Sequence, residues 1–163
     1  MGLQNGYAQH AKDTDAAMKQ LGLHIESFPG RLKQISVEEL LSRPAENKWS
    51  KKEILGHLID SAVNNLKRFT DIQFSAQPYK IISYNQTELV IVNDYQNLSL
   101  DHLLNLWQNL NRQIVYVVQR IPSEKLSYAV DPQYENKETK TLGWVICDYV
   151  AHMEHHFRQI FSE

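Results

Sequence analysis

Apolar residues recur at intervals of three and four along four long segments of the chain, which is the period of an amphipathic helix. The four segments cover residues 12–35, 50–75, 99–121 and 141–160. The strand-like runs LVIV (89–92) and VVQR (117–120) are too short and too isolated to build a sheet. We therefore expect an all-α protein in which four long helices pack lengthwise as a four-helix bundle.

Capping residues mark the ends of these predicted helices. Ser50 and Glu53 have the spacing of a capping box, in which each side chain accepts a hydrogen bond from the other residue's backbone N–H. Ser99 and Thr141 are the expected N-caps of the third and fourth helices. Proline has no backbone N–H, so we expect Pro29 to kink the first helix or to end it.

Three connections join the long helices. Residues 36–44 predict a short helix that ends at Pro44, and residues 122–140 form a polar connection. Residues 76–97 are irregular and rich in asparagine, glutamine and tyrosine, with a pattern that allows a short helix near 87–93. A connection as long as 76–97 often has a functional role in a compact domain.

Composition narrows the class of protein. The 163 residues are 42% hydrophobic and 22% charged with a formal net charge of −2, which suits a single globular domain over residues 1–163. The near-neutral charge provides no basic surface for nucleic acid. The chain shows neither a signal sequence nor an apolar run of ~18 residues, so we expect a soluble, cytoplasmic protein. Its one cysteine, Cys147, cannot form an internal disulfide or a four-cysteine zinc site.

Seven histidines provide the candidate chemistry. His152 and His156 are four residues apart, so they project from one side of the fourth helix and can share a metal ion. His155 points partly away from His156, and His57 on the second helix is the best candidate for a third ligand. Three neutral imidazoles suit Zn²⁺ or Ni²⁺ first, with Fe²⁺ or Mn²⁺ as alternatives. A mononuclear site with three protein ligands and an open position is typical of a catalytic metal.

Familiar metal motifs do not fit this pattern. Zincin peptidases need a glutamate directly after the first histidine, where this chain has Met153, and the inverted motif needs a glutamate where His155 stands. Di-iron bundles need Glu-x-x-His pairs that the chain lacks. The alternative that His152 and His156 lie on a solvated helix face stays open, because such spacing also arises by chance.

A polar row follows His57 along the second helix, at Ser61, Asn64 and Arg68. The spacings of four, three and four residues put these side chains beside the apolar stripe. Such a row lines a pocket if the helix edge is buried, and it is an ordinary half-exposed edge if it is not. Both interpretations remain open at this point.

Several segments resemble the DinB-like (YfiT-like) superfamily. They are WSKKEILGHLIDSAVNN (49–65), SYNQ (83–86), NDYQ (93–96), LWQNLNRQIVYVV (106–118) and TLGWVICDYVAHMEHHFRQI (141–160). The resemblance extends from about Glu38 to Phe161. It implies a four-helix bundle, often a homodimer, that holds one divalent metal ion. In this chain the family's three histidine ligands match His57, His152 and His156.

The resemblance also implies a range of functions. Members of the superfamily include thiol-dependent transferases and isomerases, and many others have no assigned reaction. We therefore expect a metal-dependent enzyme that acts on a small molecule, as a thiol S-transferase or as a hydrolase. The alternative is a non-catalytic, dimeric, helical module that binds metal and is related to stress.

Further residues are candidates for the pocket around such a metal. Arg68 is expected to hold an anionic group of a low-molecular-weight thiol, and Ser61 or Asn64 to orient it. Tyr84 and Gln86, on the irregular connection, are expected to close over the site. Asp148 lies one turn before His152 and is a candidate partner for that imidazole.

Overall fold

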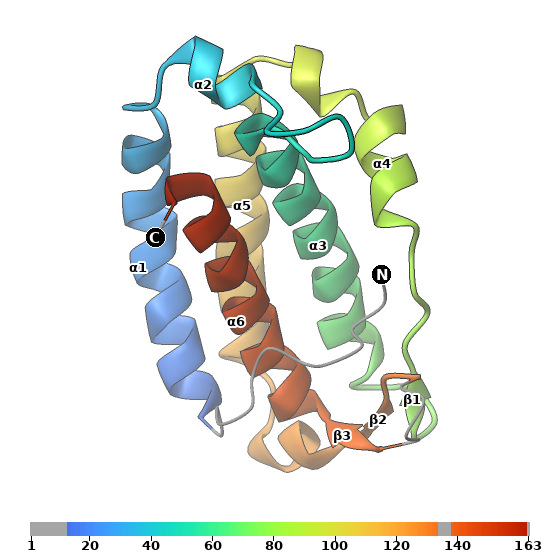
Figure 1. Cartoon of the computed structure of the whole chain (residues 1–163). Coiled ribbons are helices and arrows are strands. Elements are labelled where there is room, and N and C mark those ends of the chain that lie inside the picture. The colour runs from blue at the N-terminus through green and yellow to red at the C-terminus, as the bar shows by residue number, and fades with distance from the viewer. Residues whose placement is uncertain (1–12, 134–137, 163) are drawn as a thin grey trace.

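Four long helices lie side by side in the computed structural model and confirm the expected bundle (Figure 1). The structure describes residues 13–133 and 138–162. The long helices are α1 (Thr14–Leu32), α3 (Lys51–Asp71), α5 (Leu100–Val118) and α6 (Leu142–Phe161). Each packs against two others: α3 and α1 both contact α5 and α6, which closes the bundle into a ring.

The long connection between α3 and α5 sets the direction of the helices. It carries the short helix α4 (Gln86–Val92) and the 3-10 turn η1 (Tyr95–Asn97), and it returns the chain to the end where α3 began (Figure 1). As a result α3 and α5 run in the same direction, while α1 and α6 run the opposite way. The short helix expected near 87–93 is confirmed by α4, and the short helix α2 (Val37–Leu41) lies within the expected 36–44.

The runs at residues 89–92 and 117–120 build no sheet, as expected, but the chain has a small sheet elsewhere that the sequence did not predict. A small three-stranded sheet lies at one end of the bundle, in the order β1 (Tyr79–Lys80), β2 (Ala129–Asp131), β3 (Lys140–Thr141). β1 is parallel to β2, which is antiparallel to β3. The strands have two or three residues each, too few for the alternating pattern by which a strand is recognised in sequence. The polar connection also contains a 3-10 turn, η2 (Ser123–Ser127).

The predicted caps are confirmed. The Ser50 hydroxyl accepts from the backbone N–H of Glu53 at 3.1 Å, and the Glu53 carboxylate accepts from the backbone N–H of Ser50 at 2.8 Å. Ser99 and Thr141 cap α5 and α6. Helix α1 is capped by Asp13, and residue 12, where the helix was expected to begin, lies outside the described residues.

Helix α1 does not end at Pro29, as was one expectation, but continues to Leu32. Proline leaves the carbonyl four residues earlier without its helical donor. In this structure the side chain of Gln108 on α5 donates to the Ile25 carbonyl at 2.9 Å. This contact between helices replaces the missing backbone hydrogen bond and lets the helix run through the proline.

Large apolar side chains fill the space between the helices. The rings of Phe28 on α1 and Phe157 on α6 stack with centroids 4.3 Å apart, and Trp107 on α5 lies 4.8 Å from Phe28. Burying a side chain of this size stabilises the fold by roughly 1.5–3 kcal/mol. Among the described residues, none of the helices combines the length and apolarity that crossing a membrane requires.

Candidate metal centre

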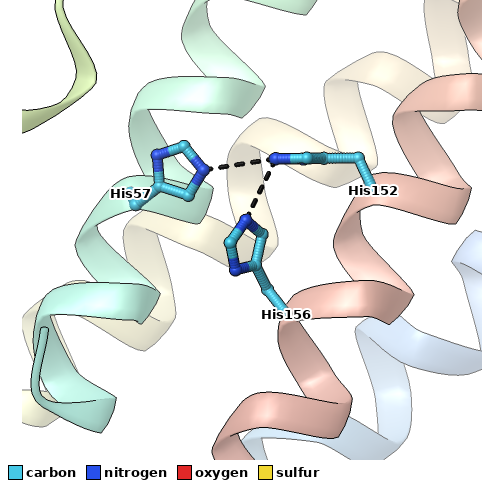
Figure 2. Close-up of side chains that lie close together, drawn as sticks. All are labelled: His57, His152 and His156. Atoms are coloured by element: carbon cyan, nitrogen blue, oxygen red, sulfur yellow. Dashed lines mark hydrogen bonds between the residues drawn. The ribbon is translucent and has the colours of Figure 1, made fainter. Parts of the chain in front are cut away.

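Three imidazoles converge between α3 and α6 (Figure 2). His57 comes from α3, while His152 and His156 come from successive turns of α6. Nε2 of His152 lies 3.2 Å from Nε2 of His57 and 3.1 Å from Nε2 of His156. All three side chains are buried, with His57 fully inaccessible and the other two 8% exposed. The structure therefore brings together the three histidines that the sequence singled out, and one ion could contact all three.

Close packing at the start of α3 positions His57. A Cβ atom at Gly56 would lie 2.1 Å from Cδ2 of Tyr95, so only glycine lets η1 approach the helix here. The ring of Trp49, just before the cap of α3, lies 5.0 Å from the His57 ring. The start of α3 is therefore closely packed at His57 and at the residue before it.

Burial keeps the three imidazoles neutral. It lowers the pKa of His57 to about 3, with a smaller contribution from the nearby His156. Burial likewise lowers the pKa of His156 to about 4, against the opposing effect of its hydrogen bond to Gln159. The pKa of His152 lies well below its ordinary value, because of burial first and the charges of neighbouring histidines second. Neutral imidazole is the form that binds a metal.

The arrangement of the three Nε2 atoms suits a shared metal ion better than it suits hydrogen bonds among them. Ligand nitrogens placed tetrahedrally around Zn²⁺ at 2.0–2.1 Å would be about 3.3 Å apart, close to the 3.1 and 3.2 Å between the His152 nitrogen and its neighbours. A neutral imidazole nitrogen either donates one hydrogen or offers one lone pair. Nε2 of His152 therefore cannot satisfy both neighbours at once, whereas one ion could accept all three lone pairs.

Part of the expected pocket row is buried below the histidines. Ser61 and Arg68 are buried and Asn64 is half-buried. The Arg68 guanidinium donates to the Ile82 carbonyl at 3.2 Å, and its centre lies 5.7 Å from the ring of Tyr84. Arg68 is among the charges that lower the pKa of His152. The row is thus not an exposed helix edge, and Arg68 lies within electrostatic reach of the histidines.

The remaining expected residues are placed as follows. The pKa of Tyr84 is raised by burial, against the opposing effects of Arg68 and of a hydrogen bond with Ser61. The Asn64 amide donates to the Asp60 carbonyl of its own helix at 2.9 Å. Gln86 is half-buried at the start of α4, and Asp148 is buried one turn before His152. The roles expected of these residues stay predictions.

The sequence did not single out two polar residues near the site, Asp60 and Gln159. The Asp60 carboxylate is buried three residues after His57; its Oδ1 accepts from the Tyr95 hydroxyl at 2.5 Å, and its Oδ2 has no hydrogen-bond partner among the described residues. Gln159 lies with Oε1 2.7 Å from Nδ1 of His156. Two features of the sequence could have pointed to these residues. One is an acidic residue within the apolar stripe of a helix, and the other is a glutamine three residues after a candidate metal ligand.

Comparison with known proteins finds relatives whose names refer to metal-dependent enzymes. Residues 20–160 match the family model of the DinB superfamily. A curated relative from Halalkalibacterium halodurans, named “Putative metal-dependent hydrolase BH0277”, is 24% identical over 140 residues, covering 83% of this chain and 80% of that protein.

Solved structures share the fold. YfiT from Bacillus subtilis, described as a probable metal-dependent hydrolase with an unusual four-helix bundle topology, matches with a TM-score of 0.77 and 21% identity over 94% of this chain and 87% of that one. The mycothiol-dependent maleylpyruvate isomerase matches with a TM-score of 0.64 and 13% identity, over 94% of this chain and 62% of that one. At these identities the likeness concerns the fold alone.

Proposed function

The chain belongs to the DinB superfamily, and from this premise we propose that it binds one divalent metal ion through His57, His152 and His156 and is a metal-dependent enzyme acting on a small molecule. The observation that carries the proposal is the convergence of three buried, neutral imidazole nitrogens at 3.1–3.2 Å around His152. The names of a hydrolase and of an isomerase among the similar proteins support enzymatic activity in general.

The chemistry follows from three neutral ligands. A Zn²⁺ or Ni²⁺ ion held by three imidazoles, or Fe²⁺ or Mn²⁺ in their place, would lower the pKa of a bound water or thiol and so supply a nucleophile at neutral pH. The protein's own contribution is to keep the ligands neutral through burial and to hold the electrophile beside them. Hydrolysis results if water reacts, and transfer to a thiol results if a low-molecular-weight thiol reacts.

The pocket row would orient the substrate. Among the residues that the structure describes, the buried Arg68 guanidinium donates to a backbone carbonyl and, at 3.5 Å, to the Asn65 side chain, which leaves N–H groups for an anionic group of the substrate or thiol. Ser61 and Asn64 lie between it and His57 on α3 and would orient the same molecule. Tyr84 and Gln86 would form the cover above it, and Asp148 would support His152 from the preceding turn.

Metal content is the first test. Protein purified without a nickel column should carry about one divalent ion per chain, measured by plasma mass spectrometry. The His57→Ala and His156→Ala variants should lose it, while His102→Ala, at an exposed position on α5, should keep it. Full occupancy in His156→Ala would contradict the ligand assignment.

Activity separates the enzyme from the binding module. The metal-loaded protein should turn over at least one substrate in a panel that pairs several thiols with small electrophiles and includes esters and amides for hydrolysis. Loss of this turnover in His57→Ala would support catalysis at the site. If metal is stoichiometric and no turnover appears across the panel, the dimeric, stress-related metal-binding module is favoured instead. Gel filtration with light scattering would test the homodimer, and cell fractionation the cytoplasmic location.

A further inference from the structure

Gln159 lies between two histidine side chains at the end of α6. Its Oε1 is 2.7 Å from Nδ1 of His156, and its Nε2 is 3.2 Å from Nε2 of His155. The spacings of three and four residues put Gln159 one helical turn after His156 and His155, within reach of each. Gln159 itself is exposed, so its side chain is no part of the apolar core.

In the structure the oxygen of the Gln159 amide faces His156 and its nitrogen faces His155. The carbonyl oxygen can only accept a hydrogen bond, so a short contact to Nδ1 of His156 requires the proton of this imidazole to reside on Nδ1. The amide NH₂ then donates to Nε2 of His155. The flipped amide would instead require the other tautomer of His156, with its proton on Nε2, so the orientation of Gln159 and the tautomer of His156 are coupled.

This proton position decides which nitrogen of His156 is available. A neutral imidazole with its proton on Nδ1 presents a lone pair at Nε2, and Nε2 is the atom that faces His152. The other neutral tautomer would present an N–H to the centre of the three histidines and could not bind an ion there. By contrast, Nδ1 of His57 has no hydrogen-bond partner among the described residues.

We propose that Gln159 is a positioning residue that fixes the tautomer and the ring orientation of His156 and thereby sets the affinity of the three-histidine site for its metal. The inference rests on the proposed function for its consequence, the metal affinity. The tautomer itself is a property of the metal-free chain. Removing a hydrogen-bonding partner behind a metal-binding histidine typically weakens metal binding about 10- to 100-fold.

The tautomer is the direct test. Two-bond ¹⁵N–¹H correlation spectra of the metal-free, full-length protein at pH 8 should show His156 with its proton on Nδ1. In Gln159→Leu, which keeps the shape and removes the acceptor, a substantial Nε2–H population should appear. Gln159→Glu, whose carboxylate also accepts, should restore the Nδ1–H form. Equal tautomer populations in the wild type and Gln159→Leu would overturn the proposal.

Metal affinity is the second readout. The dissociation constant for Co²⁺, followed by its visible absorption, should rise about 10- to 100-fold in Gln159→Leu and stay near the wild-type value in Gln159→Glu. Gln119→Leu is the matched control, because Gln119 is an exposed glutamine at the end of α5, and it should leave the dissociation constant unchanged. An unchanged dissociation constant in Gln159→Leu would overturn the role in affinity.

The two readouts keep the proposals separate. If the wild type binds no metal while the tautomer still depends on Gln159, the proposed function fails and the positioning of His156 stands. If the wild type binds one metal ion and the Gln159→Leu variant matches it in both tautomer and affinity, the inference about Gln159 fails and the metal site stands.

Discussion

His57 on α3 and His152 on α6 are 95 positions apart in the chain, and their Nε2 atoms lie 3.2 Å apart. Two neutral imidazoles at this distance share at most one hydrogen, and the third nitrogen, from His156, lies just as close to His152. The contact therefore links the packing of two helices to the affinity of the site: a metal ion bound here would join α3 to α6.

Removing a bound metal should lower the stability of the protein. A ligand that binds only the folded chain stabilises it by about 2.7 kcal/mol when its free concentration is 100-fold above the dissociation constant. We expect excess EDTA to lower the melting temperature of the metal-loaded wild type, followed by circular dichroism. The His156→Ala variant serves as the control and should melt at the same temperature with and without EDTA. A wild-type melting temperature that ignores both added Zn²⁺ and EDTA would argue against a metal bound between α3 and α6.

Acid should destabilise the metal-free protein through the same residues. Burial lowers the pKa of His57 to about 3 and of His156 to about 4, whereas an unfolded histidine titrates near 6.5. Between these values the unfolded chain binds more protons, so stability is complete above pH 6.5 and declines as the pH falls towards 4 and 3. Each of the two histidines should lower the free energy of unfolding by about 2 kcal/mol when the pH falls from 7 to 5.

Urea unfolding of the metal-free protein at pH 7 and pH 5 measures this effect. The His156→Gln variant lacks one of the titrating groups and should show a smaller difference between the two pH values. Identical unfolding free energies at pH 7 and pH 5 in the wild type would contradict the depressed pKa values. In the metal-loaded protein, protons compete with the ion for the folded-state imidazoles, so occupancy should fall as the pH approaches their lowered pKa values of about 4 and 3.

Gly56→Ala should destabilise the fold next to His57. The new methyl group would lie 2.1 Å from the Tyr95 ring, so the ring or the backbone of η1 must move. Overpacking of this kind costs about 1–3 kcal/mol, and chemical denaturation would measure it. Gly22→Ala is the matched control, because Gly22 lies within α1 and nothing lies within 4 Å of a Cβ added there. Since alanine has the higher helix propensity, this substitution should be neutral or should stabilise the protein by up to about 1 kcal/mol. Equal stabilities of the two variants would contradict the close approach of Tyr95.

Gln108 should stabilise the protein only because Pro29 is present. Gln108→Ala removes the donor to the Ile25 carbonyl and should cost about 1 kcal/mol. In a Pro29→Ala background, residue 29 regains a backbone N–H that can donate to the same carbonyl, so the cost of Gln108→Ala should shrink. A double-mutant cycle measured by urea denaturation gives the coupling, and a cost that is the same in both backgrounds would contradict it.

Local sequence patterns were enough to predict most of the fold. Helical periodicity and the caps at Ser50, Ser99 and Thr141 predicted the helices, because a helix repeats one local geometry and its ends need local hydrogen-bond partners. Of the two outcomes expected for Pro29, the end of α1 there is wrong, because a residue distant in sequence, Gln108 on α5, satisfies the Ile25 carbonyl. The small sheet was missed for the same reason, since β1 pairs with β2 about fifty residues later, Tyr79 opposite Val130.

The candidate site, like the fold, depends partly on local sequence and partly on tertiary packing. The sequence by itself determined that His152 and His156 share one side of a helix, because four residues make about one helical turn. It also offered His57 on the second long helix as the best third ligand, a choice with which the family resemblance agreed. Only the tertiary structure decided that the three nitrogens meet, that they are buried enough to stay neutral, and that Gln159 stands behind His156. Proton affinity and side-chain convergence depend on the packing of α3 against α6, and no local pattern in either helix specifies that packing.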